Sequence, residues 1–112
     1  MLFRSEKLAD TVETIKQAGG DAEVMAANVG DSEAVNEIVN KVADDWGRLD
    51  IMVNNAGITR DNLLPAMSDE QWDAVIDINL RGTFLFCRAA SKVMMRARSG
   101  RIINIEIGRA HV

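Results

Sequence analysis

Apolar residues recur at helical spacing in three stretches of this chain. The first predicts a helix over about residues 6–18, with Ser5 as its cap and Gly19-Gly20 as its end. A second helix is expected between the turn at residues 30–32 and the terminator Gly47. Its apolar positions fall on one helical face: Val35, Ile38, Val39, Val42 and Trp46.

The third helical stretch is the longest. Ser68 and Gln71 form a capping box, which predicts a helix that starts near residue 69. The apolar pattern then continues towards Arg98, with a kink expected between Asn79 and Gly82.

Three short apolar runs that do not alternate with polar residues separate or follow these helices. They are residues 22–28, 49–53 and 101–105, and we expect each of them to be a buried strand. A crossover between parallel strands needs a helix-length connection. The alternation of helices with short strands therefore predicts an α/β fold built on a parallel sheet.

Composition excludes several classes of protein. The chain has 112 residues, of which 47% are hydrophobic and 27% charged, so it is one globular domain at most. A net charge of −4 argues against a nucleic-acid partner. No apolar run approaches the roughly 20 residues of a membrane span. The N-terminal apolar stretch is interrupted by charged residues too early to be a signal peptide. With the single Cys87 and no Cys/His cluster, we expect a cytoplasmic protein without membrane contact, disulfide or metal site.

Two asparagine motifs point to function. Asn54-Asn55-Ala56-Gly57 directly follows the predicted strand at 49–53, at the end where open α/β sheets bind ligands, and Asp77-Ile78-Asn79-Leu80 comes later. Together with Ile58-Thr59-Arg60-Asp61-Asn62-Leu63-Leu64, these motifs strongly resemble the central segment of the short-chain dehydrogenase/reductase family. The resemblance covers about residues 4–105. Residues 54–64, 67–72 and 98–105 look most like the bacterial and plastid 3-oxoacyl-acyl-carrier-protein reductases.

The resemblance implies that residues 1–105 are part of a doubly wound, Rossmann-like domain that binds NADP(H). Arg4-Ser5 match the place where a cation and a hydroxyl contact the adenosine 2′-phosphate, although an exposed Arg and a helix cap explain them equally well. Asn28-Val29 match the position that faces the adenine, unless Asn28 simply ends its strand. Asn55-Ala56-Gly57 match a stretch whose backbone passes close to the nicotinamide ribose.

Asn79 is the residue closest to catalysis that the resemblance implies. In the family this asparagine marks a helix kink, and its backbone carbonyl holds a water of a proton relay to the catalytic lysine; a satisfied polar residue at a kink is the alternative. The implied reaction is hydride transfer from the nicotinamide to a ketone, with a serine, a tyrosine and a lysine around the carbonyl. The chain has no tyrosine, and Ile107 stands where the serine is expected. We therefore expect the chain to be a fragment that is inactive by itself.

The resemblance also suggests partners. A basic residue at the Arg98 position helps to dock the acidic acyl carrier protein in the resembling subgroup, although attraction to the helix dipole is a sufficient alternative. The helix over residues 69–97 would pair with its copy in a homodimer or homotetramer.

Two predictions concern the ends of the chain and the order of its strands. We interpret residues 106–112 as a tail that is not native, because they break the family pattern abruptly. In the strand order 3-2-1-4-5-6, the three predicted strands would be the third, fourth and fifth, so residues 22–28 would have no neighbouring strand.

Two other functions stay open from the sequence. One is a different activity in the same family, such as an acetoacetyl-coenzyme A reductase or a sugar or alcohol dehydrogenase. The other is a short binding or oligomerisation module without catalysis.

Overall fold

The computed structural model describes residues 5–57 and 63–105. In chain order its elements are helix α1 (Ser5–Gln17), helix α2 (Ser32–Trp46), strand β1 (Ile51–Asn54), the 3-10 turn η1 (Leu64–Ala66), helix α3 (Asp69–Val75), the π-helical segment η2 (Ile76–Arg81), helix α4 (Gly82–Ala97) and strand β2 (Arg101–Asn104). Residues 58–62 of the family motif lie outside the described residues, and so does the whole tail at 106–112.

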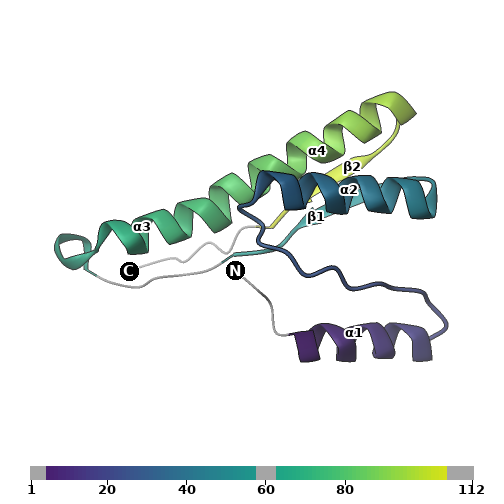
Figure 1. Cartoon of the computed structure of the whole chain (residues 1–112), viewed down its shortest axis with the longest axis horizontal. Helices are drawn as coiled ribbons and strands as arrows, with labels where there is room; N and C mark the ends of the chain where they lie inside the picture. The colour runs from purple at the N-terminus through teal and green to yellow at the C-terminus, as the bar shows by residue number, and fades with distance from the viewer. Residues whose placement is uncertain (1–4, 58–62, 106–112) are drawn as a thin grey trace.

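The two strands form a parallel sheet, as the sequence predicts for an α/β fold. Ile51 pairs with Arg101 and Asn54 pairs with Asn104, so both strands end at the same edge of the sheet. Helix α4 packs on β1, and α2 lies alongside α4 (Figure 1). The core between these helices consists of Val35, Val39, Leu85 and Ala89, with Leu49, Phe86 and Val93 packed against it.

Local signals in the sequence set the ends of the helices. Asp31 caps α2 by accepting the backbone N–H groups of Glu33 and Ala34, and Gly47 ends it in the left-handed conformation with φ of 76°. The predicted capping box before α3 is confirmed: Ser68 Oγ accepts from the Gln71 N–H at 3.1 Å, and Gln71 Oε1 accepts from the Ser68 N–H at 2.9 Å.

The predicted long helix is also confirmed. It begins at Asp69 and runs through α3, η2 and α4 to Ala97, and Arg98 ends it with φ of 56°. Where the sequence predicts a kink, the helix widens into the π-helical turn η2, which contains Asn79. Such single-turn expansions inside α-helices often mark functional sites.

The prediction of a strand at residues 22–28 is wrong for this chain, because the sheet has only β1 and β2 among the described residues. A strand is stable only when its N–H and C=O groups pair with a neighbour, and neither strand lies beside this segment. It is instead tied to α2 through Glu23, which accepts from Trp46 Nε1 at 3.3 Å and lies 3.8 Å from Lys41 Nζ. The hydrogen bond from Lys41 to Asp45 raises the pKa of the lysine, with a smaller effect from Glu23.

Much apolar surface stays uncovered. Helix α1 is set apart from the sheet and from the other helices (Figure 1), and the radius of gyration is 16.1 Å. A compact domain of this length would have about 13 Å. Ile51 and Val53 on β1 are 60% and 46% exposed. Within the described part of the chain, no helix is both long and apolar enough to cross a membrane.

Candidate functional site

The site begins with the loop that connects residues 22–28 to α2. Asn28 Oδ1 accepts from the Gly30 N–H at 2.9 Å, and the Asn28 carbonyl accepts from the Asp31 N–H at 3.0 Å, so the loop is a tight turn ahead of the helix cap. Asn28 is exposed, whereas Val29 is buried. We call residues 28–30 the adenine-side loop, because the family resemblance matches Asn28 and Val29 to the position that faces the adenine.

The adenine-side loop rests on the long helix where η2 meets α4. A Cβ added to Gly82 would lie 3.1 Å from Val29 Cγ2 and 3.3 Å from the Val29 carbonyl, so a larger residue would push the loop away by a few tenths of an ångström. Arg81, the preceding residue, donates from Nε to the Gly30 carbonyl at 3.1 Å. The contact explains why a glycine, which is a poor helix former, stands inside this helix.

A polar cluster closes the carboxyl end of the sheet. Asn54 is buried at 8% exposure, and its Nδ2 donates to Asn104 Oδ1 at 2.8 Å and to Cys87 Sγ at 3.4 Å. The Asn54 carbonyl accepts from the Ile105 N–H at 3.0 Å. Sequence reasoning singled out the pair Asn54-Asn55 but missed Asn104 and Cys87 as the hydrogen-bond partners of Asn54. Their proximity depends on the strand register and on how α4 packs.

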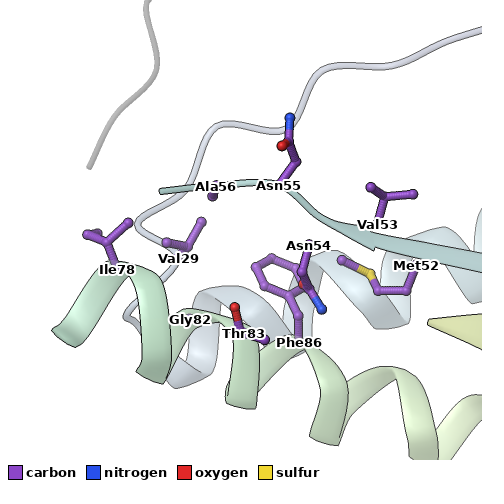
Figure 2. A pocket seen from close by; sticks show the side chains of 10 residues that line it. All are labelled: Val29, Met52, Val53, Asn54, Asn55, Ala56, Ile78, Gly82, Thr83 and Phe86. Atoms are coloured by element: carbon purple, nitrogen blue, oxygen red, sulfur yellow. The ribbon is translucent and has the colours of Figure 1, made fainter. Parts of the chain in front are cut away.

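A pocket lies between the end of β1, the adenine-side loop and the long helix (Figure 2), with about 430 Å³ of empty space that is continuous with solvent. Its lining residues are Val29, Met52, Val53, Asn54, Asn55, Ala56, Ile78, Gly82, Thr83 and Phe86. Three residues that the sequence assigns to cofactor binding therefore meet here: Val29, Asn55 and Ala56. They come from segments that are more than twenty residues apart in the chain.

The last residue of β1 and the residue after it point in different directions. In Figure 2, Asn54 points towards Phe86 on α4, whereas Asn55 projects to the other side of the strand. This is the alternation expected of extended backbone. Asn54 is buried and Asn55 is exposed, so the first asparagine has a structural role and the second is free to meet a ligand.

Gly57 and Asn79 lie next to each other beside the pocket. A Cβ added to Gly57 would be 3.4 Å from Asn79 Oδ1. The Asn79 carbonyl accepts a hydrogen bond from Thr83 Oγ1 at 2.9 Å. The structure thus places the two asparagine motifs of the sequence at one site.

Two further predicted positions, Arg4-Ser5 and Arg98, have to be considered apart from this pocket. Arg4 and the side chain of Ser5 lie outside the described residues, and α1, which Ser5 begins, is set apart from the site (Figure 1). Arg98 follows the far end of α4, about 24 Å along the helix axis from Gly82. Across the described ranges, no three His, Cys, Asp or Glu residues gather to hold a metal ion; His111 falls outside those ranges.

Sequence reasoning missed five lining residues on the long helix and β1 that belong to neither asparagine motif: Met52, Val53, Gly82, Thr83 and Phe86. A glycine inside a predicted helix was the signal that could have identified Gly82, because such a glycine usually has a packing reason. The others look like ordinary helix or strand residues, and no local pattern marks them.

Comparisons with known proteins agree on one protein family. A family model described as short chain dehydrogenase matches residues 1–111. The chain is 48% identical over 100 residues to the 3-oxoacyl-[acyl-carrier-protein] reductase FabG of Staphylococcus aureus and 51% identical over 87 residues to a 3-oxoacyl-[acyl-carrier-protein] reductase of Synechocystis. These matches cover 89% and 78% of this chain, but only 41% and 35% of the relatives.

The fold matches as well. A metagenomic short-chain oxidoreductase, whose crystal structure is a complex with NADP, superposes with a TM-score of 0.84 at 38% sequence identity. The match covers 90% of this chain and 46% of the oxidoreductase. The chain therefore spans less than half the length of the relatives it matches.

Proposed function

The chain belongs to the short-chain dehydrogenase family, and we propose that it forms part of the cofactor site of an NADPH-dependent reductase of 3-oxoacyl thioesters. One observation carries this proposal: Val29, Asn55, Ala56 and Ile78, from three separate segments, line one pocket at the carboxyl end of a parallel strand. This is where open α/β sheets bind nucleotide cofactors.

The residues present fit a nicotinamide dinucleotide. Val29 and Ile78 offer apolar surface for a flat base, and Ala56 and Gly57 leave room for the backbone to approach a ribose. Asn28 would face the adenine edge, and Arg4-Ser5 remain the proposed contacts of a 2′-phosphate. When bound, the cofactor supplies the hydride for the ketone carbon.

Asn79 would act beside the reacting groups rather than on the substrate. The π-helical turn η2 fixes its backbone, and the hydrogen bond from Thr83 orients its carbonyl. We propose that this carbonyl holds a water of the proton relay, close to the path of the cofactor past Gly57.

The proposed substrate is a 3-oxoacyl group on acyl carrier protein. Support comes from the names of the two reductases quoted above, each about half identical to this chain. Arg98 and its exposed neighbours Arg96 and Arg101 place three cations at the end of α4, where an acidic carrier protein could dock. The cytoplasmic location stays a prediction.

The long helix is the proposed contact between copies. Trp72, Leu80 and Met95 on it are 58%, 63% and 77% exposed, so these large apolar side chains are available for a contact. We propose that this surface is covered by the same helix of a second copy, as a homodimer or as part of a homotetramer.

Turnover by the complete gene product tests the proposal. The rate of NADPH oxidation, followed by absorbance, should be highest with a 3-oxoacyl group on acyl carrier protein as the substrate. The rate should be lower with acetoacetyl-coenzyme A, a sugar or a simple ketone. We expect the 112-residue chain alone to be inactive, because it has no tyrosine to donate the proton. Preference for one of the other substrates would assign a different activity in the family, and no turnover of any of them would favour a module without catalysis.

A further inference from the structure

Arg81 is the last residue of η2, and its side chain reaches across to the adenine-side loop. Its Nε donates to the Gly30 carbonyl at 3.1 Å, between residues that are 51 positions apart in the chain. The guanidinium is charged at all physiological pH values, so this is a charge-assisted hydrogen bond to a backbone group.

The contact controls the position of Val29. Gly30 also lies against η2, since an added Cβ would be 3.4 Å from the Asp77 carbonyl. Val29 packs on Gly82, the residue after Arg81, and its buried side chain lines the pocket. If the Gly30 carbonyl were released, the loop could rotate away from the helix and take Val29 out of the pocket wall.

We propose that Arg81 is a positioning residue for the cofactor, which fixes the adenine-side loop against η2 and so keeps Val29 in the pocket wall. This inference rests on the proposed function. Arg81 is not among the residues that line the pocket, and its effect passes through Gly30 to Val29. Arg81 therefore sets the affinity for the adenosine half of the cofactor and leaves the hydride step unchanged.

Arg88 provides a matched control. It lies two helical turns further along the same helix, and its Nη2 donates to Ser32 Oγ at 3.2 Å. It therefore links the long helix to the first residue of α2, outside the adenine-side loop. Replacing either arginine with methionine removes one charge and one exposed hydrogen bond, to a backbone carbonyl for Arg81 and to a hydroxyl for Arg88. Arg88→Met also removes a cation–π contact, because the Arg88 guanidinium lies 4.9 Å from the centre of the Phe84 ring.

The test measures binding of NADPH and of 2′,5′-ADP, which lacks the nicotinamide half, to the complete gene product. Arg81→Met should raise both dissociation constants about fivefold, the effect of one net hydrogen bond, while kcat at saturating NADPH stays unchanged. Arg81→Lys should recover part of the affinity, and Arg88→Met should bind both ligands like the unaltered protein.

Two results would overturn the inference alone: equal dissociation constants for Arg81→Met and the unaltered protein, or an equal loss in Arg88→Met. If the unaltered protein bound neither NADPH nor 2′,5′-ADP, the proposed function would fail, and this inference with it. The melting temperature of each variant separates a local change from loss of the fold, and Arg81→Lys gives a second reading if the methionine variant is unstable.

Discussion

Gly57 faces the side chain of Asn79, with room for one methyl group between the glycine Cα and Asn79 Oδ1. A Cβ at Gly57 would lie 3.4 Å from that oxygen, an ordinary van der Waals distance. The end of β1 and the π-helical turn η2 thus meet at a point where neither backbone nor side chain is crowded. The packing around Gly57 therefore leaves room for a methyl group, and the proposed cofactor is the reason that we give for the glycine.

The first prediction follows from this spacing. Gly57→Ala in the complete gene product should leave the melting temperature within about 2 °C, because the new methyl group fits beside Asn79. The dissociation constant for NADPH should rise about tenfold, because the methyl group occupies space that the cofactor ribose needs. Unchanged affinity in a folded variant would mean that the cofactor does not pass Gly57.

The second prediction concerns the hydrogen bond between Asn54 and Asn104. Asn54→Leu and Asn104→Leu should each destabilise the complete protein by about 1–3 kcal/mol, because each leaves an amide without its partner. The double variant should lose less than the sum, with a coupling energy of about 1 kcal/mol in a double-mutant cycle followed by denaturant unfolding. Strictly additive losses would show that the two amides do not interact in solution.

The third prediction separates two roles of Arg98. Its backbone has φ of 56° and ψ of 29°, a left-handed conformation that favours glycine. Arg98→Gly should therefore stabilise the complete protein by about 1 kcal/mol, yet raise KM for the substrate on acyl carrier protein by removing a cation.

An uncharged thioester of the same acyl group is the control substrate for Arg98→Gly, and its KM should not change. Arg98→Lys, which keeps the charge, should bind the carrier protein almost as well as the unaltered protein. If KM for the carrier-protein substrate did not respond to Arg98→Gly, the docking role proposed for this residue would be wrong.

The fourth prediction concerns the 112-residue chain by itself. With β1 open at one edge and α1 apart from the core, heating should give a broad, weakly cooperative loss of helical circular dichroism. Exposed strand edges also favour aggregation. A sharp melting transition of a monomeric species would contradict this expectation.

Local chemistry made most of the fold predictable. Asp31 and the pair Ser68 and Gln71 mark helix starts by hydrogen bonds within a few residues, and Gly47 marks a helix end by its left-handed conformation, so the sequence alone locates these ends. Residues 22–28 have an equally clear strand pattern but form no strand here. Strand formation depends on a neighbour elsewhere in the chain, and no local pattern reports whether that neighbour is present.

For the candidate site, too, the sequence indicates local motifs and not the contacts between distant segments. Val29, Asn55 and Ala56 were assigned from motifs, and the structure places them around one pocket. Gly82 and Arg81 were not assigned, because their roles depend on the packing of the long helix against a loop about fifty residues earlier. The pattern of hydrophobic residues does not predict tertiary contacts of this kind.

A crystal structure of the complete gene product with bound NADPH tests the central claim most directly. The account predicts that the adenine lies against Val29, and that the nicotinamide ribose passes the backbone of Asn55-Ala56-Gly57 with Asn79 beside it. A cofactor bound at another edge of the sheet, without contact to Val29 or to residues 55–57, would contradict it.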